Sequence, residues 1–251
     1  MDALVRELNG LGYQPVFLPG TGPQPPELYS YSQSQRRLVR RGPLADYLPK
    51  TADVPVIEAD LANIDYQYTS GKNVSATASF LQNSLKCIGI DALPKLDLGF
   101  AGSNDFSFAF TGVKSRRVDP SKIDTLISGL NVGAIPTDIV QAGRIHIVYE
   151  YAYANELVMS RNDRREFKSD VSGKIGEFID IGTKGSVSLA SKSTISFKGA
   201  EGQRAAFAYK AGYLSREDEL SKWEFHPEEM HRGDEDAQAY IPARGVVLIA
   251  D

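Results

Sequence analysis

Few residues in this 251-residue chain have the type and spacing that catalysis requires. His226, Glu229 and His231 are spaced closely enough to gather a metal ion, but they stand in an acidic segment that offers no second pair of ligands. Cys87 falls within a helical pattern without a base nearby, which is typical of a packed core cysteine rather than a nucleophile. The sequence therefore predicts no catalytic residue, no metal and no cofactor. A hydrolase or metal enzyme that uses His226 and His231 is the weaker alternative.

Composition and charge limit the partners of the chain. A hydrophobic content of 42%, a charged content of 24% and a formal net charge of −4 are ordinary for a globular protein and favour no nucleic-acid partner. Arginine pairs at positions 36–37, 40–41, 116–117 and 164–165 suit an anionic lipid surface, or are solvated turn charges. A single cysteine, with no signal segment and no long apolar run, predicts a cytoplasmic protein.

Alternation of apolar and polar residues predicts strands as the main elements of the chain. The longest alternating runs lie at residues 145–154, 187–197 and 206–213, and we expect Tyr149 and Tyr151 to share one face of the first run. The second face of these strands is small or polar, which suits either a soluble antiparallel sheet or a ribbon that later meets lipid.

Other segments complete an α+β class, a twisted and mostly antiparallel sheet with packed helices. Helical periodicity predicts helices at residues 73–87 and 121–130, the second capped by Asp119 or Ser121. Further extended segments are expected at 29–39 and 54–68. A hairpin should join residues 96–100 to 106–110, and a single helical turn is expected at 43–49.

The C-terminal segment differs from the rest of the chain. Residues 226–238 are charged and contain Gly233, which is typical of a linker, whereas residues 239–251 are apolar and β-prone. An apolar strand on an acidic linker must dock on the body, because it would otherwise promote aggregation. The predicted organisation is a body at 1–225, a protease-sensitive linker at 226–238 and a separable strand at 239–251.

Loose motifs follow one another through most of the chain. Arg117-Val-Asp-Pro leads into a helix, Ile139-Val-Gln-Ala-Gly-Arg opens a long strand, and Arg204-Ala-Ala-Phe-Ala-Tyr belongs to a later one. This order of elements resembles the gasdermin pore-forming family. The short C-terminal segment resembles the bacterial members, in which a terminal peptide is the inhibitor and a neighbouring protease is the activator.

The resemblance implies a gasdermin N-domain-like fold that the C-terminal strand holds inactive as a cytoplasmic monomer. After cleavage by an activating protease, such a body binds membrane lipids, anionic ones among them, and assembles into a homo-oligomeric β-barrel pore. Pore formation in the cell membrane then causes cell death, as an anti-phage defence. The converting regions would be residues 66–113 and 147–197.

The resemblance also assigns residues to roles. The side chains expected on the membrane hairpins are Phe106, Phe108, Phe110, Ile147, Tyr149, Tyr151, Val187, Leu189, Ile195 and Phe197. Cleavage is expected around Arg232, Gly233, Asp234, Glu235 and Asp236. Inhibitory contacts are expected from Tyr240, Ile241, Val246, Val247, Leu248 and Ile249.

A second class stays open from the residues alone, a soluble α+β binding or adaptor module whose tail is the last strand of its sheet. Such a module would unfold when residues 240–251 are removed, and it would not be toxic. Under the pore-forming interpretation, Ile195→Asp or Tyr149→Asp should instead abolish the toxicity of the truncated chain, because a charge on a lipid face costs about 2–4 kcal/mol.

Overall fold

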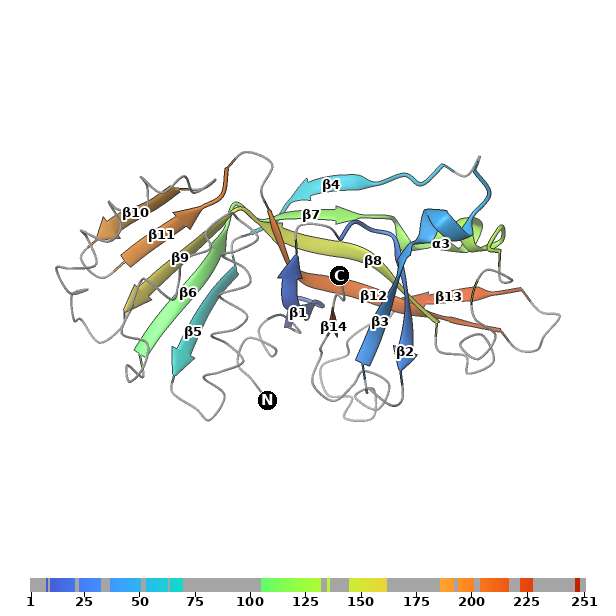
Figure 1. Cartoon of the computed structure of the whole chain (residues 1–251), viewed down its shortest axis with the longest axis horizontal. Helices are drawn as coiled ribbons and strands as arrows, with labels where there is room; N and C mark the ends of the chain where they lie inside the picture. Colours follow the sequence, from blue (N-terminus) through green and yellow to red (C-terminus); the bar gives the residue numbers. More distant parts are fainter. Residues whose placement is uncertain are drawn as a thin grey trace.

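The computed structural model describes residues 8, 10–20, 23–32, 37–50, 53–62, 64–69, 105–131, 135, 145–161, 186–191, 194–200, 204–216, 222–227 and 247–248. Within these residues the chain forms one sheet of nine strands and one of five, which Figure 1 shows next to each other along the long axis of the molecule. The sheets are mostly antiparallel, as expected. The only α-helix whose bounds fall in this part of the chain is α3 (Pro120–Ile127), so the expected packing of several helices is not confirmed.

Two long neighbouring strands form the centre of the larger sheet, β8 (Ile145–Ala154) and β12 (Ala205–Ser215). They pair antiparallel from end to end, and every residue of β8 is buried. Strands buried on both faces need apolar or fully hydrogen-bonded side chains on each. The other strands are β13 (Glu224–Pro227), β1 (Gln14–Gly20), β14 (Val247–Leu248), β3 (Arg37–Pro43), β2 (Glu27–Ser32), β7 (Lys114–Arg117) and β4 (Ile57–Asp60).

Two compensating β-bulges interrupt the ladder between β8 and β12. The register passes over Tyr149 on β8 and over Phe207 on β12. A bulge adds one residue to its strand, so alternation beyond it is shifted to the opposite face. Tyr149 therefore packs in the cluster under α3, whereas Tyr151 packs in the cluster on the other side of the sheet. The prediction that these two tyrosines share one face is wrong.

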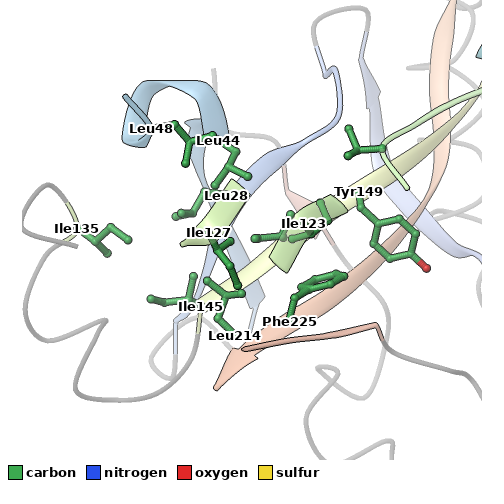
Figure 2. Close-up of a cluster of buried hydrophobic side chains, with 12 residues drawn as sticks. Leu28, Leu44, Leu48, Ile123, Ile127, Ile135, Ile145, Tyr149, Leu214 and Phe225 are labelled. Atoms are coloured by element: carbon green, nitrogen blue, oxygen red, sulfur yellow. The ribbon is translucent and has the colours of Figure 1, made fainter. Parts of the chain in front are cut away.

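Helix α3 covers one face of the larger sheet. Of the two predicted caps, Asp119 is the one that caps the N-terminus, by accepting a hydrogen bond of 2.9 Å from the Ser121 backbone N–H. Asp124 accepts a hydrogen bond of 2.9 Å from the Phe225 N–H, which links the helix to β13. Figure 2 shows the buried cluster between helix and sheet, whose members are Leu28, Leu44, Leu48, Val118, Ile123, Ile127, Ile135, Ile145, Ile147, Tyr149, Leu214 and Phe225.

The smaller sheet has the strand order β10-β11-β9-β6-β5 and is antiparallel throughout its described pairs. Strand β6 pairs with β5 along one edge and with β9 along the other, so neither edge is available to residues 96–100. The prediction that residues 106–110 pair with 96–100 in a hairpin is therefore wrong, because the neighbours of β6 are β5 and β9. Residues 96–100 themselves, and the predicted helix at 73–87, lie outside the described residues. The strands are β5 (Ile64–Thr69), β6 (Asp105–Thr111), β9 (Glu156–Arg161), β10 (Ser186–Ser191) and β11 (Thr194–Lys198).

The segment at 29–39, expected as a single strand, belongs to two. Strands β2 and β3 pair antiparallel with Ser32 opposite Arg37, so the chain reverses direction between them. The sequence Ser32-Gln-Ser-Gln-Arg interrupts the apolar alternation at that point, and a polar interruption favours a turn over a continued strand. The predicted helical turn is present as the 3₁₀ helix η1 (Leu44–Tyr47), and the extended segment at 54–68 contains β4 and the start of β5.

The chain passes between the two sheets at one narrow place, which we call the waist. Strand β6 leads into β7 through Gly112, and β8 leads into β9 through Asn155. These two residues are adjacent in space, since a Cβ on Gly112 would lie 2.5 Å from Asn155 Oδ1. The Gly199 N–H donates to the Asn155 carbonyl at 2.7 Å, so the connection after β11 passes here as well. The Leu61 N–H donates to the Val113 carbonyl at 2.9 Å, which brings the connection after β4 to the same place.

Candidate functional site: the five-stranded sheet and the C-terminal strand

Potential metal ligands do not converge in the described part of the chain. No group of three or more His, Cys, Asp and Glu side chains lies there in a position to hold a metal ion. The His226 Nε2 and Ser215 Oγ atoms share a hydrogen bond of 2.8 Å, and the His226 ring stacks on Tyr213 with centroids 5.0 Å apart. Glu229 and His231 lie outside the described residues. None of the described helices has the length and apolar character that crossing a membrane requires.

Most residues predicted to lie on membrane hairpins come together in the smaller sheet. Its register contains two rows of Cα partners with apolar residues only, Phe110–Leu157–Phe197–Val187 and Phe108–Met159–Ile195–Leu189. Phe106 lies further along β6, opposite Arg161. The side chains that the structure describes in these rows are all buried, namely Phe110, Leu157, Ile195 and Phe197. The Phe110 ring also stacks on Phe207 of the larger sheet, with ring centroids 4.2 Å apart, so these four described side chains are part of the core.

The alternate rows of the smaller sheet are small or polar, with Val158 as the exception. They read Ala109–Val158–Ser196–Ser188 and Thr111–Glu156–Lys198–Ser186. Glu156 accepts hydrogen bonds from Ser196 and, at 2.9 Å, from Thr111, and the hydroxyl oxygens of Ser160 and Thr194 are 3.1 Å apart. Across four adjacent strands, one set of rows is therefore entirely apolar, whereas the alternate rows are small or polar apart from Val158.

Three residues predicted to lie on membrane hairpins are not in the smaller sheet. Ile147, Tyr149 and Tyr151 belong to β8 of the larger sheet, and they lie on both of its sides. Tyr149 packs edge-to-face on Phe225 with ring centroids 5.8 Å apart. Because Tyr149 and Ile195 are both core residues, an aspartate at either position would disturb the fold before the protein met a membrane. Those two substitutions do not separate the pore-forming interpretation from its alternative.

The C-terminal strand is inserted between two strands of the larger sheet. Strand β14 pairs parallel with β1, where Val247 lies opposite Val16. It also pairs parallel with β3, where Val247 lies opposite Leu38 and Leu248 opposite Val39, and Figure 1 shows it between the two strands. The residues of the predicted cleavage site and the other predicted inhibitory residues lie outside the described residues, namely Arg232, Gly233, Asp234, Glu235, Asp236, Tyr240, Ile241, Val246 and Ile249.

A buried carboxylate organises polar side chains in the same sheet. Glu27 of β2 is only 1% exposed, and it accepts hydrogen bonds from Tyr151 Oη at 2.7 Å, Tyr29 Oη at 3.1 Å and Arg40 Nε at 3.0 Å. The backbone N–H of Gln24 also donates to it, at 3.4 Å. Burying a charge is costly unless it is paired and hydrogen-bonded, and Glu27 meets both conditions.

Burial sets the protonation of the tyrosines around Glu27. Desolvation raises the pKa of both Tyr29 and Tyr151. The negative charge of Glu27 raises the pKa of Tyr29 further, and Tyr29 and then Glu27 raise that of Tyr151 further. Tyr13, which donates a hydrogen bond of 2.6 Å to the buried Glu150, has its pKa raised by desolvation and by that bond. These hydroxyls therefore remain protonated donors at neutral pH.

Residues 16–224, which run from β1 to the start of β13, match the model of the Bacterial Gasdermin Family. The chain belongs to the bacterial gasdermin family. It is 38% identical to gasdermin bGSDM of Piscinibacter sakaiensis over 258 residues, which cover 100% of this chain and 95% of that protein. The structure of a bacterial gasdermin from Bradyrhizobium tropiciagri matches with a TM-score of 0.59 over 90% of this chain and 91% of that chain. Its sequence is 11% identical, so that likeness concerns the fold alone.

Membership of the family confirms the resemblance drawn from the sequence motifs. Gasdermins are pore-forming and non-enzymatic proteins, so membership supports a pore-forming effector role in general terms. The antiparallel sheets of this gasdermin agree with the fold of its bacterial relative.

Cationic side chains gather at the outer edge of the larger sheet of this gasdermin. Glu58 of the edge strand β4 lies 3.2 Å from Arg204 Nη1, 3.3 Å from Lys114 Nζ and 3.7 Å from Arg116 Nε. Hydrogen bonds from Arg204 and then Lys114 lower the pKa of the Glu58 carboxyl, which therefore stays ionised. The three cations outnumber Glu58 and the nearby Asp60, so the edge carries a positive excess.

Sequence reasoning missed Glu27 and Asn155. The signal for Glu27 is weak, a single carboxylate in the otherwise β-prone run Glu27-Leu-Tyr-Ser-Tyr. Asn155 carries a stronger signal, because it interrupts the longest alternating run of the chain directly after Ala154.

Proposed function

We propose that this gasdermin is the inactive precursor of a membrane pore. A partner protease cuts within residues 226–238 and frees the C-terminal peptide, residues 239–251. The body then leaves the cytoplasm for the cell membrane, binds its lipids and assembles with further copies. The strands of the smaller sheet extend as hairpins of a large β-barrel, and the open pore kills the cell as an anti-phage defence.

The amphipathic register of the smaller sheet is the observation that carries this proposal. Its strands come from two segments, residues 64–69 with 105–111 and residues 156–161 with 186–198, and these fall on the two regions expected to convert. A strand that crosses a bilayer needs alternate residues for lipid and for water, and the sheet supplies them in continuous rows. Because Phe110, Leu157, Ile195 and Phe197 are buried, the precursor keeps the described side chains of its apolar rows away from solvent.

The positive edge of the larger sheet supports anionic lipids as the preferred partner. Lys114, Arg116 and Arg204 each keep about a third of the side chain exposed, at 37%, 35% and 33%. Anionic headgroups attract basic side chains by roughly 1 kcal/mol each near the surface, within a Debye length of about 8–10 Å. This edge is therefore suited to orient the released body on an anionic leaflet.

Dye leakage from liposomes tests the proposal. A recognition site for a highly specific protease is inserted between residues 228 and 238, and the purified chain is cut in the presence of vesicles that contain about a third anionic lipid. We expect leakage only after the cut, together with large oligomers on the vesicles. One control is the same chain without protease, and the other is the cut chain with vesicles of neutral lipid. A cut chain that stays monomeric while the vesicles stay sealed would contradict the proposal.

A pair of lysine substitutions tests which rows meet lipid. Strand β10 is an edge strand of the smaller sheet, so changes there should disturb the precursor less than changes in the inner strands. Leu189→Lys, in an apolar row, should abolish leakage of the cut chain, whereas Ser188→Lys, at an exposed position in a polar row, should preserve it. Equal leakage from both variants would show that the apolar rows do not face lipid in the pore. If removal of residues 239–251 unfolds the chain, the alternative of a soluble binding module gains support instead.

A further inference from the structure

Phe207 of β12 falls at a break in the register with both neighbouring strands. Against β8, Ala206 pairs with Tyr153 and Ala208 with Ala152, so Phe207 is the extra residue of a bulge. Against β1, the register also shifts between Ala206 and Ala208, and the described pairs give Phe207 no Cα partner there either. A bulge redirects the side chain of the residue that it inserts. The Phe207 ring is therefore not bound to the alternation of its own strand.

The ring of Phe207 packs on the smaller sheet. Its neighbours Ala206 and Tyr209 belong to a tyrosine-rich cluster of the larger sheet, whereas Phe207 does not. The Phe207 ring is fully buried and stacks on Phe110 of β6, with ring centroids 4.2 Å apart and an angle of 5° between the ring planes. Phe110 lies two residues before Gly112, where the chain enters the waist. The stack therefore joins the two sheets beside the waist, through side chains.

Phe110 is also part of an apolar row that the proposed pore presents to lipid. It is the Cα partner of Leu157, and the row continues through Phe197 and Val187. In the structure, Phe207 covers one side of the Phe110 ring, and a lipid chain cannot occupy the same place. Phe207 lies outside the two segments expected to convert, so the stack must break when β6 extends. A contact that exists in only one of two states favours that state.

We infer that the stack of Phe110 on Phe207 is a latch that holds the smaller sheet against the larger one after the linker has been cut. Strand β14 pairs with β1 and β3, so its release does not itself remove this contact between β6 and β12. The latch must open before the strands of the smaller sheet extend, and it therefore slows the conversion of the cut chain. This inference rests on the proposed function for its effect on membranes, but not for the coupling of the two sheets.

The strength of an aromatic stack suits a latch that has to open. Beyond the apolar area that it buries, a pair of aromatic rings changes an equilibrium constant by a factor of about two to ten. A factor of this size favours the docked smaller sheet without fixing it there. Because the stabilisation from burying apolar side chains grows with the buried area, a membrane that takes up whole apolar rows outweighs one ring contact. The latch should therefore change the rate of conversion and not its final extent.

Hydrogen exchange of the uncut chain tests the coupling of the sheets without membranes. Phe207→Leu removes one ring of the stack and keeps an apolar side chain. The readout is the exchange rate of the β6 and β9 amides divided by that of the β8 amides, and we expect Phe207→Leu to raise this ratio about two- to tenfold. The matched control is Phe225→Leu, which removes the ring that packs on Tyr149, the other bulged aromatic residue, within the larger sheet. The control should not raise the ratio, even if it lowers the stability of the whole chain.

The rate of dye release tests the effect on conversion. In the chain with the inserted protease site, Phe207→Leu should release dye about two- to tenfold faster after the cut than the unsubstituted protein, and Phe225→Leu should be no faster. An unchanged exchange ratio would overturn the latch, and so would an unchanged release rate from vesicles that the unsubstituted cut chain opens. If Phe207→Leu raises the ratio while no cut chain opens vesicles, the coupling of the sheets stands and the proposed pore fails. Should Phe207→Leu fail to fold, Phe207→Met, which fills irregular gaps without a ring, replaces it in both measurements.

Discussion

At the scale of single residues, the buried carboxylate of Glu27 is the group at which replacing one oxygen should lower the free energy of unfolding most. Every group that the structure places on this carboxylate is a donor, namely the Tyr29 and Tyr151 hydroxyls, the Arg40 guanidinium and the Gln24 N–H. Glu27→Gln would point an amide NH₂ at one of these donors and leave Arg40 without its counter-charge. We expect a loss of about 2–4 kcal/mol in the free energy of unfolding. Urea denaturation with an unchanged m-value measures it.

The matched control is Glu58→Gln at the edge of the same sheet. Glu58 also contacts three cations, but its side chain is 40% exposed, and exposed pairs contribute about 0–1 kcal/mol. The comparison separates the effect of burial from that of the number of contacts. A Glu27 variant no less stable than the Glu58 variant would show that the buried network is not a stabilising feature.

The structural role of a residue can be predicted from sequence only when the groups it contacts are close to it in the chain. Asp119 was predicted as a helix cap because a cap binds its own helix, and the structure confirms it. Glu27 could not be predicted, because Tyr151 lies 124 positions away and its approach depends on which strands pair. Pairing between distant strands is a property of the sheet, and local spacing does not contain it.

At the scale of elements, the waist between the sheets contains a glycine, Gly112, that other residues replace only at a cost in stability. Gly112 has a φ of +60°, in the left-handed region that costs other residues about 1–2 kcal/mol. Gly112→Ala should therefore lower the free energy of unfolding by about 1–2 kcal/mol. The clash with Asn155 adds less, because the end of that side chain can rotate away. Thermal and urea denaturation measure the loss.

Gly10→Ala provides the matched control for this substitution. Gly10 lies at a helical position with a negative φ and has open space where a Cβ would be added. Alanine favours helix over glycine by up to about 1 kcal/mol, so this variant should be neutral or slightly more stable. Similar losses at the two positions would mean that the backbone conformation of Gly112 is not what constrains the waist.

Strands were predicted well where alternation was long, and less well where it was interrupted. The run at 145–154 is strand β8 with the bounds expected, yet the faces of its tyrosines were wrong because the bulge at Tyr149 shifts the alternation. A bulge leaves no mark on the composition of a strand, since it is defined by the register with its neighbour. The partner of β6 was wrong for a related reason, because proximity along the chain favoured 96–100 over the distant β5.

At the scale of the whole molecule, the sequence predicted only in part which segments belong to each of the two sheets. The two regions expected to convert supply all the described strands of the smaller sheet, apart from small differences at their ends. The sequence predicted the strand at 145–154, but it could not show that β9, which follows Asn155, would belong to the other sheet. A single residue, Asn155, separates the two strands. Its contacts in the waist, with Gly112 and Gly199, come from distant parts of the chain, so the sequence does not show them.

A disulfide between β14 and its neighbour β3 tests how the whole molecule is held inactive. Leu38 of β3 and Val247 of β14 are Cα partners, and neighbouring strands lie about 4.7–4.9 Å apart, within the Cα separation that a disulfide spans. The double substitution Leu38→Cys with Val247→Cys, in a Cys87→Ser background, should form this bond. After cleavage of the linker, we expect the oxidised protein to leave vesicles sealed and the reduced protein to release dye. Each single cysteine variant should leak with or without reductant, which excludes a direct effect of the substitutions. Leakage from the cut protein while the bond is intact would show that the pore can form while β14 stays between β1 and β3, and the C-terminal strand would then inhibit by some other means.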